Sequence, residues 1–458
     1  MRRNLPFFVR SNSASIVMAS TVAGYVALFF TLSWAKHRTF HATSYDLANY
    51  VRSVWGLIHG DPYVPLLGGS YVWGAHFDPI LYVPALLGRW VPIIPLLLFL
   101  QSLALGFTGW VAFLGAKRAL GPAAALFLGG AVLLHPSIHN ANLFEFHPLT
   151  LGLPFLALFL YFWSQRRFDA ATLALLIALM AREETAGILF VWGLYRMRHD
   201  RWKGRALFLL SILWVVTLVL VKFGNQEVWT DHFTRALTQV ASNRLEILGT
   251  KLRDPFLVLL GFGLLPLYRP KALIWILLPV LFFLAYPTGW YGRIDFHYTA
   301  FYIPFLAFAS IQALEAIDPR KRKLAMMVFG ICAVVISWSY SLAPWNRNGD
   351  PGSFMEDRYA RAADAILSKI SPEMSVAAPV AMLASLAERK WIFKEVAVGV
   401  DALILEKNPV RTLGESESNY KERLRSIPRI IRDVAERFHY RPEYEGKDLV
   451  LFLRTRRQ

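Results

Sequence analysis

Long apolar runs, separated by short polar connections, occupy the first three quarters of the chain. These runs fall near residues 14–34, 93–114, 121–136, 148–164, 169–182, 186–198, 205–222, 255–268, 272–287, 298–316 and 323–341. A run of about 20 apolar residues, rising about 1.5 Å per residue, can cross the roughly 30 Å hydrocarbon core of a bilayer. The pattern therefore predicts an α-helical polytopic membrane protein with about 11 transmembrane or partially spanning helices.

Basic residues recur at every second connection between these runs. They are Arg2, Arg3 and Arg10 before the first run, then Lys117/Arg118, Arg166/Arg167, Arg196–Arg205, Arg269/Lys271 and Arg320–Lys323. Because cytoplasmic loops carry an excess of Lys and Arg, this spacing predicts a cytoplasmic N-terminus and a periplasmic or extracellular C-terminal part. The first run lacks an obvious cleavage signature, so we expect a retained anchor in the cell (inner) membrane.

Residues 168–197 require a choice between one helix and two. A single helix would be about 45 Å long and would place the basic clusters at its two ends on opposite sides of the membrane. Two short helices joined at Arg182-Glu183-Glu184 keep both clusters on the cytoplasmic side. The turn with its three charges would then lie within the membrane depth, which requires that it face protein or a water-filled cavity.

The C-terminal part has a different pattern. Residues 1–341 are predicted to be the membrane domain, and residues 342–458 a small soluble α/β domain on the non-cytoplasmic side. Helices are expected at 359–370, 380–389 and 419–438, and strands at 375–378, 391–398, 402–406 and 448–454. This part contains no Gly-rich phosphate loop, nucleophile elbow or CxxC motif, so it is interpreted as an accessory domain.

Charge and cysteine content exclude other classes of protein. The formal net charge is +17, but the basic residues stand in short clusters between apolar runs, so no nucleic-acid partner is expected. Cys332 is the single cysteine, which excludes an intramolecular disulfide and a cysteine-based metal cluster.

The first outer loop, residues 35–79, carries candidate chemistry. Asp46 opens a stretch to Ile58 that is amphipathic at helical spacing and would lie along the membrane interface. The Asp46 carboxylate is either a helix N-cap beside Ser44 or a functional acid. The loop ends with His76 and Asp78, directly before the next apolar stretch.

Three further outer-side segments bring ionisable groups next to apolar helices. With the first loop they form a candidate site at one face: Glu145 and His147, then Arg182, Glu183 and Glu184, then Arg293, Asp295, His297 and Tyr298. Carboxylates paired with imidazoles suit acid–base chemistry, since burial and neighbouring cations shift their pKa values. Such sets also suit a divalent cation, although their spacing is no specific metal signature. Local salt bridges and snorkelling side chains are the structural alternative.

Tryptophans gather at the outer ends of the apolar runs. An interfacial aromatic belt explains most of them. For Trp55 and Trp73 in the first outer loop, stacking on a sugar or contact with lipid is the functional alternative.

The ordered motifs resemble a known family. They are SYDLANYVRSVWGLIHGDPYV, HFDPILYVPAL, NLFEFHPLTLGLP, LIALMAREETAGIL and FHYTAFYIPF, which cover nearly the whole membrane part. They resemble a family of predicted prokaryotic membrane proteins that is grouped with the GT-C glycosyltransferases. The resemblance implies transfer of a sugar from a polyprenyl-phosphate donor to an acceptor of unspecified chemistry at the outer face of the membrane.

The resemblance also implies residue roles. GT-C enzymes carry an acidic residue in the first outer loop, and Asp46 occupies that position. Because Leu47 and Ala48 follow it, in place of a second acid, direct base catalysis is the implied role. Arg182 and Arg293 would neutralise the lipid phosphate, as a departing phosphate needs fixed positive charge. A transporter or flippase is the alternative, since broken helices with charges at depth also build transport sites, and a non-catalytic membrane scaffold is the third reading.

Overall fold

The structure is a computed structural model that describes residues 7–42, 44–64, 66, 70–71, 76–223, 244–285, 292–394, 397, 399–408 and 417–455. The chain divides into two compact units. The membrane unit comprises Met1–Ser33, Trp73–Val83 and Leu96–Pro351, and the mixed unit comprises Trp34–Val72, Pro84–Pro95 and Gly352–Gln458. The mixed unit thus combines two segments from the first hundred residues with the C-terminal part of the chain.

Five described helical segments are long and apolar enough to cross a membrane, by length and composition. They are Ser13–Arg38 within α1 (Phe7–Arg38), α4 (Ile93–Leu120), Arg201–Val221 within α10 (Arg201–Phe223), Tyr298–Ala316, which joins η6 (Tyr298–Tyr302) to α14 (Ile303–Ala316), and α15 (Pro319–Tyr340). A sixth span results if α5 (Pro122–Leu134) and α6 (Pro136–Phe144), bent by 41°, are taken together. The predicted mostly helical membrane fold with a small C-terminal sheet is therefore confirmed.

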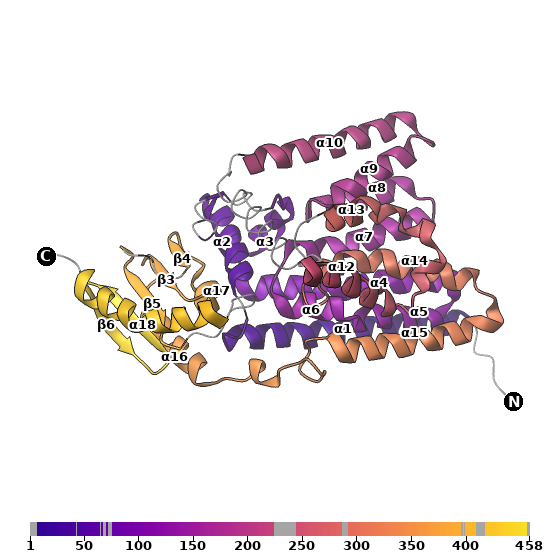
Figure 1. The fold of residues 1–458 in the computed structure, drawn as a ribbon. Coiled ribbons are helices and arrows are strands. Elements are labelled where there is room, and N and C mark those ends of the chain that lie inside the picture. The colour runs from indigo at the N-terminus through magenta and orange to yellow at the C-terminus, as the bar shows by residue number, and fades with distance from the viewer. Residues whose placement is uncertain are drawn as a thin grey trace. The chain divides into compact units, whose positions relative to one another are not determined.

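Shorter helices complete the membrane unit. They are α7 (Pro148–Ser164), α8 (Phe168–Leu179), α9 (Thr185–Arg196), α12 (Arg244–Leu260) and α13 (Leu277–Ala285), with 3-10 turns η2 (Pro79–Leu81), η3 (Leu265–Tyr268) and η4 (Pro270–Ile276). The predicted break between two short helices is confirmed, because α8 ends at Leu179 and α9 begins only at Thr185. Helices α7, α8, α9 and α10 pack side by side in chain order (Figure 1). Each of α8 and α9 is about 18 Å long, too short to cross a bilayer alone.

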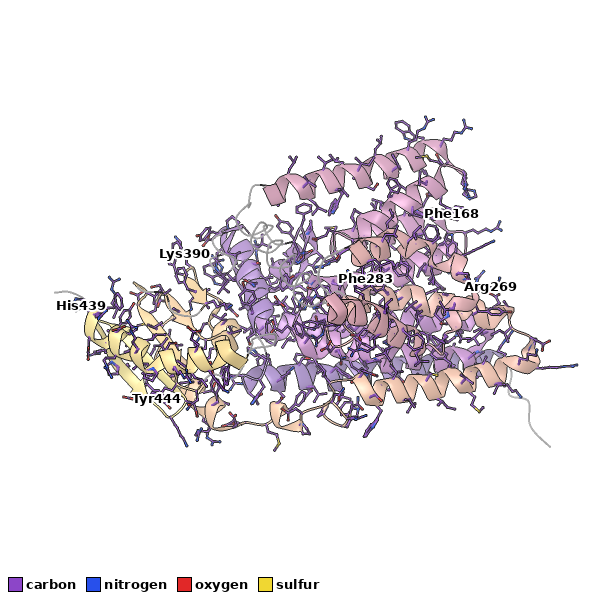
Figure 2. The ribbon with its side chains drawn as sticks, viewed as in Figure 1. Phe168, Arg269, Phe283, Lys390, His439 and Tyr444 are labelled. Atoms are coloured by element: carbon purple, nitrogen blue, oxygen red, sulfur yellow. The ribbon has the colours of Figure 1, made fainter. Side chains whose placement is uncertain are left out.

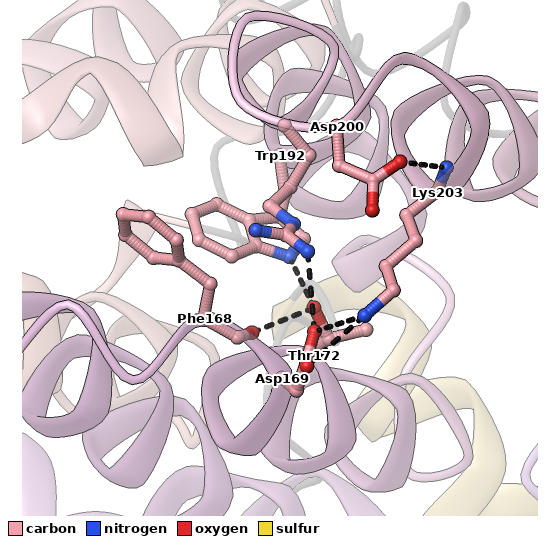
Figure 3. Close-up of polar contacts among 7 residues, drawn as sticks. Phe168, Asp169, Thr172, Trp192, Asp200 and Lys203 are labelled. Carbon is pink, nitrogen blue, oxygen red and sulfur yellow. Dashed lines mark hydrogen bonds and ion pairs between the residues drawn. The ribbon is translucent and has the colours of Figure 1, made fainter.

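A polar network ties α8 to the helices that follow it (Figure 3). The buried indole of Trp192 donates to the Thr172 hydroxyl at 2.8 Å. Asp169 accepts from Arg196 at 3.1 Å and from Lys203 at 3.0 Å. Because Arg196 is buried, the Asp169 carboxylate provides the opposite charge that a buried guanidinium requires.

Among the described glycines, Gly204 and Gly292 allow close approach of their neighbours. A Cβ at Gly204 would lie 2.4 Å from the backbone nitrogen of Met197, so α10 meets the end of α9 backbone to backbone. Small residues serve this purpose where helices pack inside membranes. A Cβ at Gly292 would lie 2.6 Å from the ring of Phe283, which is labelled in Figure 2.

In the mixed unit, α2 (Tyr45–His59) confirms the amphipathic helix predicted over residues 46–58. Leu47, Val51 and Val54 are fully buried. This helix packs against α17 (Leu383–Leu386) and the short strand β1 (Tyr63–Val64), which pairs with β2 (Ser70–Tyr71). The apolar face of α2 is thus covered by protein, and its placement along the membrane interface stays a prediction.

A five-stranded sheet forms the core of the mixed unit, in the order β4-β3-β5-β7-β6. Its strands are β3 (Val376–Ala378), β4 (Ile392–Lys394), β5 (Ala402–Glu406), β6 (Tyr440–Glu445) and β7 (Leu449–Arg454). Strand β3 pairs in parallel with β4 and β5, whereas β7 runs antiparallel to β5 and β6. Helices α16 (Arg358–Leu367), α17 and α18 (Glu417–Arg437) accompany the sheet, with the turns η7 (Pro351–Phe354) and η8 (Val380–Met382). Six-residue α3 (Tyr82–Leu87) precedes α4.

Candidate functional site

Polar side chains from four connections gather in the membrane unit. His76 precedes η2, and Glu145 with His147 lies between α6 and α7. Arg182-Glu183-Glu184 forms the break between α8 and α9, and His297 with Tyr298 begins the segment that continues as α14. We call His76, His147, Arg182, Glu183, Glu184, His297 and Tyr298 the polar cluster.

Arg182 is at the centre of the polar cluster. Its guanidinium is buried and makes a two-pronged ion pair with Glu184, from Nε to Oε2 at 2.7 Å and from Nη2 to Oε1 at 3.0 Å. The other terminal nitrogen, Nη1, lies 3.4 Å from the ring nitrogens of His76. The guanidinium carbon stands 5.8 Å from the centre of the Tyr298 ring. Such a fork fixes the guanidinium plane as well as its position.

Glu183 holds the imidazole of His76 from the other side. The Nδ1 atom of His76 lies 2.9 Å from Oε1 of Glu183. Because a hydrogen bond to a carboxylate fixes both ring orientation and tautomer, this contact presents the opposite edge of the His76 ring in a defined direction. Neighbouring Glu183 and Glu184 therefore serve different partners: one orients an imidazole and the other a guanidinium.

His147 and His297 form a stacked imidazole pair. Their ring centres are 3.4 Å apart and the planes differ by 18°. Burial holds the pKa of His297 well below its ordinary value, and His147, Arg182 and His76 shift this pKa in the same direction. His297 is therefore neutral near pH 7 and retains one N–H donor and one acceptor nitrogen. The Tyr298 ring, 3.9 Å from the His297 ring, connects this pair to Arg182.

Gln101 on α4 positions the connection that bears His147, and sequence reasoning missed it. Its Nε2 donates to the carbonyl oxygens of Ala141, Asn142 and Glu145 at 3.1, 3.2 and 3.0 Å. Its Oε1 accepts from the His147 amide at 3.0 Å and the Thr150 hydroxyl at 3.1 Å. The signal was present, since a glutamine in the middle of an otherwise apolar run is costly in a membrane unless it has partners.

Arg293 belongs to a neighbouring group of charges. It makes a two-pronged pair with Asp295, at 2.9 and 2.6 Å. Buried Asp254, which the sequence analysis did not single out, pairs with Arg253 at 2.6 Å and accepts from the Ile294 amide at 3.2 Å.

An aromatic path joins Arg293 to the imidazole pair. Its guanidinium carbon lies 5.0 Å from the ring of Phe296, which is 5.0 Å from Phe144. The Phe144 ring in turn lies 5.7 Å from both His147 and His297.

Glu145 and Asp78 are both buried beside these elements. The Glu145 backbone carbonyl accepts from Gln101 and from Nδ1 of His147. The amide of Ile80, two residues after Asp78, donates to the Met180 carbonyl at 2.8 Å and so ties this connection to the end of α8.

Asp46 lies in the mixed unit, in the first turn of α2. The N-cap of α2 is Ser44, so Asp46 is not the capping residue that the structural alternative required. A carboxylate in the first turn is stabilised by the helix dipole. Trp55 lies on the same helix, with its ring stacked on His59 at 4.2 Å and Arg52 at 4.8 Å, whereas Trp73 falls outside the described residues.

Within the described part of the chain, no group of three or more His, Cys, Asp or Glu side chains is arranged to hold a metal ion. The guanidinium of Arg182 is opposed in the polar cluster by two carboxylates: Glu184 pairs with it at 2.7 Å, and Glu183 contacts His76. An anion would meet there the guanidinium and the imidazole N–H groups, which are the hydrogen-bond donors of the cluster.

Comparisons with known proteins agree with this fold. The family model described as "Predicted membrane protein (DUF2079)" matches residues 36–451. No curated protein matches the chain in sequence. The crystal structure of ArnT from Cupriavidus metallidurans bound to undecaprenyl phosphate matches with a TM-score of 0.55 at 15% identity, over 94% of this chain and 98% of ArnT. The same ArnT in the apo state matches with a TM-score of 0.52 at 14% identity, with the same coverage. At these identities the likeness shows the fold, and the predicted GT-C-like fold is confirmed.

Proposed function

The chain belongs to the DUF2079 family of predicted membrane proteins, and on that premise we propose that it is a GT-C-type glycosyltransferase. It would transfer a sugar from a polyprenyl-phosphate donor to an acceptor at the outer face of the membrane. We place it in the cell (inner) membrane, with a cytoplasmic N-terminus. Residues 342–458 would form a soluble periplasmic or extracellular domain beside the membrane domain 1–341.

The observation that carries the proposal is the polar cluster at the break between α8 and α9, in a chain with the ArnT fold. The ArnT structure holds undecaprenyl phosphate, a lipid whose headgroup is an anion. In this chain, a buried guanidinium, a carboxylate-oriented imidazole and a stacked imidazole pair meet at one place. These groups suit a lipid phosphate, because preorganised donors stabilise the negative charge that develops as the phosphate leaves.

The reaction would invert the anomeric centre. Asp46 takes the proton of the acceptor hydroxyl, and the hydroxyl oxygen forms a bond to the anomeric carbon of the sugar. The bond from that carbon to the phosphate oxygen breaks, and its electron pair leaves with the polyprenyl phosphate. Arg182 compensates the charge on this phosphate, with Arg293 as a second cation.

The remaining residues orient the groups that react. We assign acid–base and orienting roles to Glu145, His147 and Glu183, in addition to the base Asp46. His76, Asp78, Glu184, His297 and Tyr298 would contact the substrate or hold those residues that do. Neutral His297 can donate a hydrogen bond to a phosphate oxygen without adding a charge that must be compensated.

The test is donor turnover by the purified full-length chain in nanodiscs. Undecaprenyl-phosphate sugars are supplied with cell-envelope acceptor fractions, and released undecaprenyl phosphate is measured by mass spectrometry. We expect Asp46→Asn to reduce release at least 100-fold, since general base catalysis contributes about 10²–10⁴-fold. Asp364→Asn, which removes a partly exposed carboxylate paired with Arg38, is the matched control.

If Asp46→Asn releases undecaprenyl phosphate as fast as the wild type, Asp46 is not the base. Movement of intact undecaprenyl-phosphate sugar across a liposome membrane, without release of the lipid phosphate, would instead favour the flippase alternative. The bend between α5 and α6 is the observation that favours the flippase alternative, because transporters build their sites at broken helices.

A further inference from the structure

An aromatic surface with flanking lysines lies on the edge strand of the mixed unit. Trp391 directly precedes β4, and Phe393 lies within it, so both side chains project from the same face of the strand. Their ring centres are 6.4 Å apart with planes only 6° from parallel. Phe393 also packs against the core of the unit, which fixes the orientation of this pair.

Tyr63 on β1 adds a third ring to this surface. Its centre lies 6.0 Å from that of Trp391, at an interplanar angle of 68°. Trp391 is 42% exposed and Tyr63 is 37% exposed, so both rings are accessible to a ligand. Of the three rings, Trp391 and Phe393 are thus nearly parallel, and Tyr63 meets Trp391 at a steep angle.

Two lysines supply positive charge beside the rings. The Lys390 ammonium lies 5.4 Å from the Trp391 ring centre, and Lys390 is labelled in Figure 2. The Lys394 ammonium lies 5.3 Å from the ring of Tyr45. Both lysines are exposed. We call Tyr63, Lys390, Trp391, Phe393 and Lys394 the aromatic platform.

The platform differs from the part of the same unit that suits lipid. Around α3, aliphatic side chains are exposed beside a tryptophan: Leu86 is 55% and Trp90 is 73% exposed. On β4, by contrast, Ile392 is fully buried, so the platform presents rings and ammonium groups without aliphatic side chains. A surface that enters a bilayer gains free energy by burying aliphatic area, which the platform does not offer.

We propose that the aromatic platform binds an anionic saccharide, and that this saccharide is the acceptor. The axial C–H groups of a pyranose carry partial positive charge and stack on the negative face of an aromatic ring. Lys390 and Lys394 complement carboxylate or phosphate substituents on the sugar. Lys394 contacts Tyr45, whose neighbour in sequence is Asp46, the proposed base, so the saccharide would lie near the start of α2.

The assignment as acceptor rests on the proposed glycosyl transfer, whereas saccharide binding itself does not. Binding is measured by isothermal titration calorimetry on the purified full-length chain, without any lipid donor. The probes are an alginate tetrasaccharide, whose sugars are uronic acids, and neutral maltotetraose. If the chain binds alginate but transfers no sugar, the proposed saccharide binding stands and only the proposed glycosyl transfer is refuted.

We expect Trp391→Ala to weaken alginate binding at least 10-fold and Trp391→Phe to restore most of it. The double variant Lys390→Ala/Lys394→Ala should weaken alginate binding more than maltotetraose binding. Trp90→Ala, which removes an even more exposed indole from the same unit, should change neither. Thermal midpoints of all variants establish that they fold.

The proposal would be overturned if the wild type did not bind alginate. It would also be overturned if folded Trp391→Ala bound alginate as tightly as the wild type. The Trp391→Ala variant and the wild type are also mixed with phosphatidylglycerol vesicles. Loss of vesicle binding with unchanged alginate binding would assign the surface to anionic lipid and would also overturn it.

Discussion

Replacement of Gln101 by leucine should loosen the connection that bears His147. The change removes five hydrogen bonds inside the membrane unit, three to carbonyl oxygens and two from donors. Some partners keep another contact. The Thr150 hydroxyl still donates to the His147 carbonyl, and Ser33 still donates to the Asn142 carbonyl.

The groups that lose most are the His147 amide and the Ala141 carbonyl. A buried polar group without a partner costs about 1–3 kcal/mol, so the two together predict a loss of about 2–6 kcal/mol. That is a large part of the roughly 5–15 kcal/mol by which a typical native protein is stable. Gln101→Glu keeps an acceptor for the His147 amide and should fall between wild type and Gln101→Leu.

The assay is thermal unfolding of the purified chain in detergent, followed by intrinsic fluorescence, together with undecaprenyl phosphate binding. Gln165→Leu is the matched control, because Gln165 makes a single 3.3 Å bond to the Tyr161 carbonyl near the end of α7. We expect the midpoint of Gln101→Leu to fall by several degrees more than that of Gln165→Leu. Equal midpoints for these two variants would refute the positioning role of Gln101.

Three further predictions address charge, protonation and packing. Arg182→Lys should weaken undecaprenyl phosphate binding at least 10-fold in native mass spectrometry, because an ammonium cannot reproduce the guanidinium fork, and unchanged affinity would contradict an anion site there. Since the pKa of His297 is lowered in the folded chain, the stability linked to this residue should be fully present above about pH 6.5. It should fall below that pH, by up to about 1.4 kcal/mol per pH unit, as the unfolded chain takes up the proton. His297→Asn should reduce this pH slope in thermal unfolding, and an identical slope would argue against a neutral buried imidazole. Gly204→Ala should lower the thermal midpoint, because its Cβ would meet the Met197 backbone, whereas Gly130→Ala, with open space around it, should not; equal midpoints would exclude a close approach.

The sequence predicted most of the elements because each reflects a local pattern. The break before α9 followed from three charges inside an apolar stretch and from basic clusters on both sides of it. Strand β6 was missed, because Pro442 and exposed charged residues are unusual in a strand and are tolerated here at the sheet edge. Local sequence patterns therefore predict helices and strands well where one face is buried, and less well for strands at the edge of a sheet.

The candidate site was predictable in composition but not in its contacts. The sequence identified His147 and His297 as candidates, yet their stacking depends on packing between segments far apart in the chain. Gln101 carries no charge, so a pattern of ionisable groups does not reveal it, although a neutral amide can satisfy several backbone groups at once. The proposed role of Asp46 still comes from its place in the sequence, and the donor-turnover assay addresses it directly.

The packing of α2 against α17 constrains how the chain can mature. The ribosome produces α2 long before α17, and domains generally fold as their segments emerge. The part of α2 that packs against α17 therefore stays uncovered until nearly the whole polypeptide has been synthesised. A nascent chain that stalls before residue 383 would present this part of α2 to quality-control proteases and chaperones.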